Sequence, residues 1–170
     1  MSAGWELTKI LSMKENDTDV VMPIVWNRQL STGNDLIDRD HKYLICLFNS
    51  IELALTKPSV LPHLPMFFDQ LVEYTQEHFK REEGIQIKIN YPNYASHRLE
   101  HEKIMSHLEQ VNRQIGGVAA SAVDTQDASP YHEMMNGGLM DMTRHLVIDH
   151  MMKADMDLVP YLENRASRLQ

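Results

Sequence analysis

The segment from His78 to His101, HFKREEGIQIKINYPNYASHRLEH, contains two pairs of potential metal ligands at helical spacing. His78 is followed four positions later by Glu82, and His97 is followed four positions later by His101. Residues four apart lie on the same face of a helix. Pro92 stands between the pairs and disfavours helical geometry in the residue before it. The segment therefore predicts two antiparallel helices that present three imidazoles and one carboxylate to a shared interior.

Four segments of the sequence place apolar residues three and four positions apart, as amphipathic helices do. The predicted inner faces are Ile37, His41, Leu44, Phe48, Ile51 and Leu55; Phe67, Leu71, Tyr74, His78, Glu82 and Ile85; His97, His101, Ile104, Leu108, Val111 and Ile115; and Met135, Leu139, Met142, Leu146 and His150. The alternation that would indicate strands is absent from the sequence. Four long helices with short connections predict an all-α fold, an antiparallel up-down-up-down four-helix bundle with an N-terminal arm.

Capping residues and helix breakers set the expected ends of these helices. Starts are predicted near residues that suit a first turn, namely Asp38, Pro62 or Pro65, Tyr94, and Ser129 with Pro130. Ends are predicted where helical geometry is disfavoured, at Lys57 with Pro58, before Tyr91, and at Gly116 with Gly117. The chain then divides into an arm (1–36) anchored by Trp5 or Trp26, the bundle (37–165) with a polar loop at 116–129, and a C-terminal tail or linker start (166–170).

Composition narrows the classes of partner. The net charge of 16 − 24 = −8 argues against nucleic acid as a partner. No apolar run approaches the ~20 residues that span a membrane, and no secretory signal is apparent. The single cysteine, Cys46, cannot form an intramolecular disulfide and is expected to be a packed thiol. We therefore expect a cytoplasmic protein with neither a membrane nor a nucleic acid as a partner.

Every predicted inner face carries at least one histidine. A single histidine on such a face is more often a hydrogen-bonded core residue than a ligand, but several buried together would cost on the order of a few kcal/mol for each unpaired group. Metal coordination removes that cost. The candidate ligands are His41, His78, Glu82, His97, His101, His150 and Asp155. Seven ligands exceed the four that one zinc ion needs, and an imidazole-rich set suits two iron ions.

The spacing of His150 and Asp155 is the least regular in this set. Five positions advance about 140° around a helix, so the two side chains do not stack. They would have to reach a shared centre from its two sides. The histidines that fall off the inner faces are expected at the surface or in helix caps; they are His63, His107, His132 and His145.

The order and spacing of the candidate ligands resemble those of the bacterial hemerythrins. The resemblance rests on Gly33 and on the segments IDRDH (37–41), HFKREE (78–83), YPNYASHRLEH (91–101) and HMMKAD (150–155). It spans roughly residues 26–162, and an ordered series of seven ligands is far more specific than a single HxxxH pair. The resemblance implies a non-haem di-iron centre inside a four-helix bundle, with reversible binding of dioxygen.

The resemblance also implies a role for each ligand. One iron would be held by His97, His101 and His150, and the second by His41 and His78. Glu82 and Asp155 would bridge the two irons, with an oxo or hydroxo group in the oxidised form, and O2 would bind at the iron with fewer imidazoles. The expected wall of the O2 pocket consists of Leu44, Phe48, Tyr74 and Leu146. Many bacterial relatives carry a tryptophan shortly before the fourth-helix histidine, and this chain has Leu-Val-Ile-Asp there.

Three uses of such a centre stay open from the sequence. The preferred one is an oxygen- or redox-sensing domain, because similar domains are often fused to signalling modules such as diguanylate cyclases and the final YLENRASRLQ reads as a linker to such a domain. The second is a free-standing oxygen carrier or storage protein. The third, a di-iron peroxidase or oxidase, is less favoured because imidazoles outnumber carboxylates and no ExxH pair lies on an inner face. We expect no catalysis by this chain itself.

Overall fold

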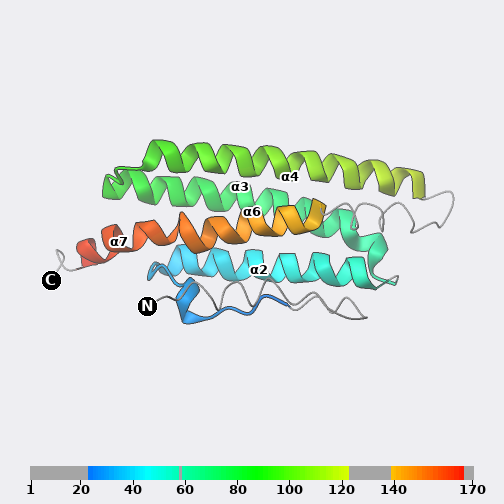
Figure 1. The fold of residues 1–170 in the computed structure, drawn as a ribbon, viewed down its shortest axis with the longest axis horizontal. Helices are drawn as coiled ribbons and strands as arrows, with labels where there is room; N and C mark the ends of the chain where they lie inside the picture. The colour runs from blue at the N-terminus through cyan, green and yellow to red at the C-terminus, as the bar shows by residue number, and fades with distance from the viewer. Residues whose placement is uncertain (1–22, 58, 123–138, 167–170) are drawn as a thin grey trace.

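The computed structural model describes residues 23–57, 59–122 and 139–166, and these ranges contain helices and no strand. The long helices are α2 (Asp35–Thr56), α3 (Leu64–Ile89), α4 (Tyr94–Ala122) and α6 (Leu139–Lys153), and α7 (Val159–Ala166) continues the line of α6. They run along one axis, and each long helix is antiparallel to the long helix before it (Figure 1). Short 3-10 turns precede α2, α3 and α7; they are η1 (Arg28–Leu30), η2 (Leu61–His63) and η3 (Met156–Leu158). The predicted all-α four-helix bundle is confirmed.

The start of α2 differs from the prediction. The helix begins at Asp35, with Asn34 as its N-cap, and the Asn34 side-chain oxygen accepts a hydrogen bond from the Leu36 N–H at 3.0 Å. Asp38, the predicted start, is buried inside the first turn. Its carboxylate accepts hydrogen bonds from the N–H and the hydroxyl of Thr32, at 2.7 and 2.9 Å. The prediction was wrong because two good capping residues stand close together and contacts with the preceding turn decide between them.

The turn between α3 and α4 lies where the sequence predicted it. α3 begins beside Pro65 and ends at Asn90, which adopts the left-handed conformation with φ 54° and ψ 51°. The N–H of Tyr91 then donates to the carbonyl of Gln86 at 2.9 Å, which satisfies an acceptor at the end of the helix. α4 begins at Tyr94. This tight connection sets α3 and α4 side by side, as an antiparallel pair.

α4 extends to Ala122 and does not end at Gly116 and Gly117, so the predicted helix end was wrong. A glycine inside a helix costs only about 1 kcal/mol relative to alanine. The full burial of Ile115, together with the packing of residues 118 and 119 on the core, offsets that cost. The rest of the predicted 116–129 loop, the predicted helix start at Ser129 and the inner-face residue Met135 lie outside the described residues.

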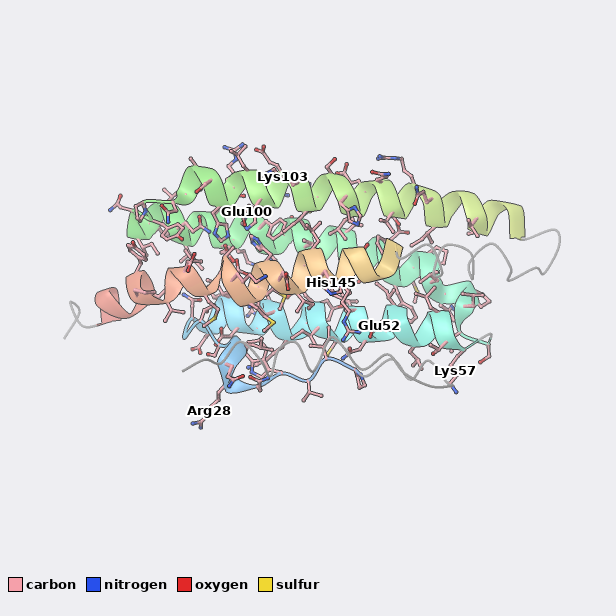
Figure 2. All side chains as sticks on the ribbon, viewed as in Figure 1. Arg28, Glu52, Lys57, Glu100, Lys103 and His145 are labelled. Carbon is pink, nitrogen blue, oxygen red and sulfur yellow. The ribbon has the colours of Figure 1, made fainter. Side chains whose placement is uncertain are left out.

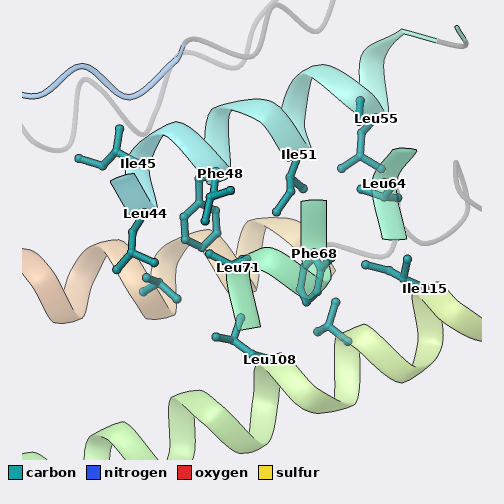
Figure 3. Close-up of a cluster of buried hydrophobic side chains, with 14 of the residues drawn as sticks. Leu44, Ile45, Phe48, Ile51, Leu55, Leu64, Phe68, Leu71, Leu108 and Ile115 are labelled. Atoms are coloured by element: carbon teal, nitrogen blue, oxygen red, sulfur yellow. The ribbon is translucent and has the colours of Figure 1, made fainter. Parts of the chain in front are cut away.

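Two apolar clusters divide the interior along the bundle axis. The main core gathers side chains from α2, α3, α4 and α6, including Leu44, Phe48, Phe68, Leu71 and Leu108 (Figure 3). The end cluster is smaller and consists of Ile37, Tyr91 and Leu158 with their partly buried neighbours. On α2, α3 and α4 the buried histidines stand in sequence between members of these two clusters. The polar centre is therefore enclosed by apolar packing on both sides.

The described part of the N-terminal arm lies against α2. Ile24 and Asn49 exchange two hydrogen bonds of 2.9 Å between the Ile24 backbone and the Asn49 side-chain amide. Trp26 is half-buried against the main core, and its ring centre lies 6.5 Å from that of His41. Trp26 is thus an anchor of the arm, as predicted, whereas Trp5 lies outside the described residues.

The surface corrects one further expectation. Cys46 is exposed and is not a packed thiol, because its position lies about 200° around α2 from both Leu44 and Phe48 on the inner face.

Glu52 on α2 forms an ion pair with Arg144 on α6 (N–O 2.5 Å), and Figure 2 shows Glu52 facing α6. Among the described residues, no helix is long and apolar enough to cross a membrane.

Candidate metal centre

All seven residues that the sequence singled out as ligands lie together in the interior. Each is at most 6% exposed. The four long helices and the turn after α6 contribute them in order: His41 from α2; His78 and Glu82 from α3; His97 and His101 from α4; His150 from α6; and Asp155 from the turn. The bundle therefore brings residues from 41 to 155 into one polar cluster, as the prediction required.

The end of α6 explains how His150 and Asp155 meet despite their irregular spacing. α6 ends at Lys153, two residues before Asp155. The Asp155 N–H donates to the His150 carbonyl at 3.2 Å, which closes a wide turn at the end of the helix. Asp155 then precedes η3 and is fully buried. The carboxylate reaches the centre from the helix end, so the two side chains need not stack on one helical face.

The nitrogen and oxygen atoms of the seven residues fall into two overlapping groups. The larger group, the three-imidazole group, contains Glu82, His97, His101, His150 and Asp155. The smaller group, the two-imidazole group, contains His41, His78, Glu82 and Asp155. Within each group one potential ligand atom from every residue lies within 4.8 Å of all the others. The two groups share both carboxylates and no imidazole.

The two oxygens of Asp155 point to different groups. Oδ1 lies 3.1 Å from His150 Nε2 and 3.2 Å from His97 Nε2, both in the three-imidazole group. Oδ2 lies 3.1 Å from His41 Nε2, in the two-imidazole group. A carboxylate with one oxygen on each side has the geometry to contact two metal ions at once.

Glu82 is divided in the same way. Its Oε1 lies 2.8 Å from His97 Nε2 and 3.6 Å from His101 Nε2. Its Oε2 lies 3.6 Å from His78 Nε2, on the other side. The 2.8 Å approach lacks hydrogen-bond geometry, since His97 Nε2 has no hydrogen-bond partner among the described residues. Two separate carboxylates thus span the same pair of imidazole groups.

Eight of the atoms that face the centre are buried and make no hydrogen bond to any residue in the described part of the chain. They are Nε2 of His41, His78, His97, His101 and His150, Oε2 of Glu82, and both carboxylate oxygens of Asp155. Buried polar atoms without partners are costly and rare, so a converging set needs an explanation. A metal provides it, because neutral imidazole nitrogens and carboxylate oxygens are ligands suited to divalent transition metals such as iron.

Comparison with known proteins agrees with this chemistry. The model of the Hemerythrin HHE cation binding domain matches residues 32–162, which include all seven buried residues. The chain belongs to the hemerythrin family. Proteins of this family hold non-haem iron and bind oxygen, and the buried imidazole and carboxylate cluster is a site that could hold such a metal.

Several individual hemerythrins are similar to the chain. A bacteriohemerythrin from Stenotrophomonas maltophilia is 30% identical over 87 residues, which cover 51% of this chain and 56% of that protein. A hemerythrin-like protein from Naegleria gruberi is 27% identical over 88 residues, covering 52% of this chain and 68% of that protein. A bacteriohemerythrin from Campylobacter jejuni is 24% identical over 136 residues, covering 80% and 92%. The matched part thus spans little more than half of the first relative, and no solved structure matches this chain.

Carboxylates also lie behind the imidazoles of this hemerythrin, on the side away from the centre. His101 Nδ1 is hydrogen-bonded to Glu83 Oε1 at 2.9 Å. His150 Nδ1 lies 3.3 Å from Oε2 of Glu100, an exposed residue of α4 that is labelled in Figure 2. A carboxylate at Nδ1 keeps a proton on that nitrogen, so that in the neutral imidazole Nε2 is the nitrogen left to bind a metal. Each of the two imidazoles is therefore oriented by a residue of the neighbouring helix.

Asp40 plays a similar part behind His78 and is held by two further residues. Its carboxylate accepts hydrogen bonds from the Tyr74 hydroxyl at 2.8 Å and from Arg81 Nε at 2.7 Å, and it lies 3.7 Å from His78 Nδ1. Burial disfavours ionisation of Asp40, but His78, Arg81 and Tyr74 outweigh it and lower the pKa of the carboxyl well below its usual value. Tyr74, predicted as a wall of the O2 pocket, thus directs its hydroxyl to Asp40.

Opposite pKa shifts divide the imidazoles of the metal-free protein. Burial lowers the pKa of His97, but the carboxylates of Asp155 and Glu82 outweigh this and raise it to about 10. The pKa of His150 is raised too, because Asp155 outweighs burial. Burial and the neighbouring His150 and His97 lower the pKa of His101 to about 2. The metal-free centre thus holds protons between its carboxylates, and a metal must displace them.

The surroundings of the cluster are largely apolar. Leu44 and Phe48, predicted for the O2 pocket, are buried in the main core, and Leu146 is partly buried against it. Phe79 was not predicted, because it falls outside the expected inner face of its helix. Its ring stacks on that of His101, with 3.7 Å between ring centres and 7° between ring planes. This apolar packing limits the access of water to the imidazoles.

Three buried or contacting polar residues escaped sequence reasoning. Asp40 stood inside the recognised segment IDRDH without an assigned role. Glu100 and its contact with His150 depend on how α4 and α6 pack, which no local pattern reveals. Gln86 is fully buried, and its Nε2 donates to Glu82 Oε1 at 2.7 Å. One signal could have found it, because it follows Glu82 by four positions on the same face.

Proposed function

We propose that the chain binds two iron ions through the seven buried residues and binds dioxygen reversibly. His97, His101 and His150 would hold one iron, and His41 and His78 the other. Glu82 and Asp155 would bridge the two. The observation that carries this assignment is the division of both carboxylates, whose two oxygens approach different imidazole groups. One mononuclear metal would require only one of the groups, so it would leave the partners of the other group unexplained.

The ligand balance supports oxygen binding over oxidation of a substrate. When bound, the di-iron centre would supply reversible binding of dioxygen. The five imidazoles are neutral ligands, and they favour the reduced metal more than a carboxylate-rich set does. The main core and the end cluster exclude water from both sides of the centre. The ligand count of each group supports two iron ions, and the iron of the two-imidazole group would have the open position for dioxygen.

Iron analysis and the visible spectrum test this function. Freshly purified protein, reconstituted with ferrous iron without oxygen and then exposed to air, should contain two irons per chain. It should also show the charge-transfer absorption of an oxo-bridged ferric pair. Zinc or copper bound in preference to iron, or an iron content near one per chain, would contradict the proposed centre.

We further propose that this centre serves an oxygen- or redox-sensing domain. The contact between the arm and the site supports this use, because the ring of Trp26 lies beside the ligand candidate His41. A change in the position of His41 on oxidation would alter the packing of Trp26 and hence the position of the arm. Limited proteolysis should therefore cut the arm at different rates in the reduced and the oxidised protein. Equal rates would favour the alternative, a free-standing oxygen carrier or storage protein.

We propose that this chain itself catalyses no reaction. For a sensing domain, the sequence of the full-length gene product should contain a fused signalling domain, such as a diguanylate cyclase, that produces the signal. Peroxide consumption by the reduced protein that outpaces its own autoxidation would instead indicate a di-iron peroxidase.

A further inference from the structure

Gln86 is a buried amide at the edge of the polar centre. It lies on α3, four residues beyond Glu82, and is fully buried. Its neighbours in sequence, Ile85 and Ile89, pack against the end cluster. A neutral amide with no access to solvent is rarely placed next to apolar packing unless its hydrogen bonds are used.

The amide is committed to one partner. Gln86 Nε2 donates to Glu82 Oε1 at 2.7 Å. Gln86 Oε1 is buried and accepts no hydrogen bond from any residue that the structure describes. The opposite orientation of the amide would set two oxygen atoms against each other at this distance. The side chain therefore satisfies the carboxylate of Glu82 while its own carbonyl is left without a partner.

The hydrogen bond makes the Glu82 carboxylate asymmetric. Oε1, which receives the bond, is the oxygen nearest His97 (2.8 Å) and His101 (3.6 Å). Oε2, which lies 3.6 Å from His78 Nε2, has no hydrogen-bond partner among the described residues. Gln86 thus acts on the side of the three-imidazole group alone.

We infer that Gln86 is a positioning residue that holds Glu82 and weakens the bond of Glu82 to the metal of the three-imidazole group. This inference rests on the di-iron function proposed above. A carboxylate that accepts a hydrogen bond is a weaker base than one that does not. A weaker base stabilises a more highly charged metal less. Gln86 therefore favours the reduced centre and raises its reduction potential, which suits a protein that must bind oxygen without being oxidised.

The substitution Gln86→Met tests this role. Methionine keeps the length of the side chain and removes the donor. Wild type and variant are loaded with ferrous iron and titrated under argon with redox mediators. At the wild-type midpoint, the ratio of reduced to oxidised variant should fall by about tenfold, which is a shift of about 59 mV for a one-electron step. The iron content should stay that of the wild type.

Two further variants make the outcome decisive. Gln86→Asn keeps an amide but withdraws it by one methylene, so it should lower the potential as the methionine variant does. Thr75→Val is the matched control, because Thr75 is fully buried on the same helix and its hydroxyl bonds only to the Leu71 carbonyl among described contacts. It should keep the wild-type potential.

Several results would overturn the role of Gln86. They are an unchanged or raised potential in Gln86→Met, a wild-type potential in Gln86→Asn, or an equal fall in Thr75→Val. These results are distinct from failure of the di-iron function, which would appear as wild-type protein that does not hold two irons. If the methionine variant does not fold, the potential of Gln86→Asn decides alone.

Discussion

The substitution Asp155→Asn removes one charge from the point where both imidazole groups meet. The amide has nearly the same shape, but its nitrogen cannot serve as a metal ligand. In the metal-free protein, Oδ1 and Oδ2 lie 3.1–3.2 Å from Nε2 of three imidazoles, His41, His97 and His150. The variant therefore disturbs the proposed bridge between the irons. It also removes the attraction between Asp155 and the three imidazoles in the protein without iron.

The magnitude follows from the burial of Asp155. The carboxylate is fully buried, so solvent does not screen the loss. Breaking a buried charge pair by removing one partner costs about 3–5 kcal/mol. For a chain of this length, a change of 1 kcal/mol shifts Tm by about 2–4 °C. We expect the metal-free variant to melt about 10 °C below the wild type, and its iron content to fall below two per chain.

Differential scanning calorimetry with and without iron, together with iron analysis, measures both effects. The matched control is Asp149→Asn, which removes a carboxylate from α6, six residues before Asp155, at a partly exposed ion pair with Lys153. Such surface pairs contribute only about 0–1 kcal/mol, so Tm and iron content should barely change. If Asp155→Asn kept two irons and melted within about 2 °C of the wild type, the reasoning about a shared carboxylate would be refuted.

Three other predictions follow from the structure. Because the pKa values of His97 and His150 are raised in the folded metal-free protein, their contribution to stability is complete below about pH 6.5 and is lost as pH rises toward the folded pKa of His97. Metal binding needs neutral imidazoles, so the gap in Tm between iron-loaded and metal-free protein should widen between about pH 6.5 and about pH 10, the ordinary and the raised pKa of His97. A gap that stays constant over this range would contradict the shifts. Asn90→Ala should lower the free energy of unfolding by about 1–2 kcal/mol because φ is 54° there, whereas Asn90→Gly should not, and urea titrations would show equal losses if the left-handed cap were irrelevant. Leu108→Ala, at a fully buried core position, should cost about 2–5 kcal/mol in the same titrations with iron content unchanged, and a loss below about 1 kcal/mol would mean that this core is loosely packed.

The sequence predicted the elements whose signals are local. The inner faces of α2, α3 and α4, the turn before Pro92 and the convergence of six of the seven buried residues follow from periodicity and spacing, since each helix displays its own face. Asp155 reaches the centre from the turn after α6, which its spacing from His150 did not require. The predicted helix ends that were wrong depended on packing against other helices, which the local sequence does not show. Gly116 and Gly117 stay helical because Ile115 and the residues after them pack on the core.

Contacts between helices were beyond sequence reasoning. Asp40 behind His78, and Glu100 near His150, pair residues of different helices whose register is set by packing. Spacing within a helix contains no information about that register. The same limit explains Phe79, whose stacking on His101 depends on how closely α3 and α4 approach.

An anomalous-scattering map of iron-loaded crystals, recorded at the iron absorption edge, tests the central claim most directly. It should show two peaks of similar height, one among His97, His101 and His150 and the other beside His41 and His78. Glu82 and Asp155 should each contact both peaks. A single peak, or two peaks that share no carboxylate, would contradict a bridged di-iron centre.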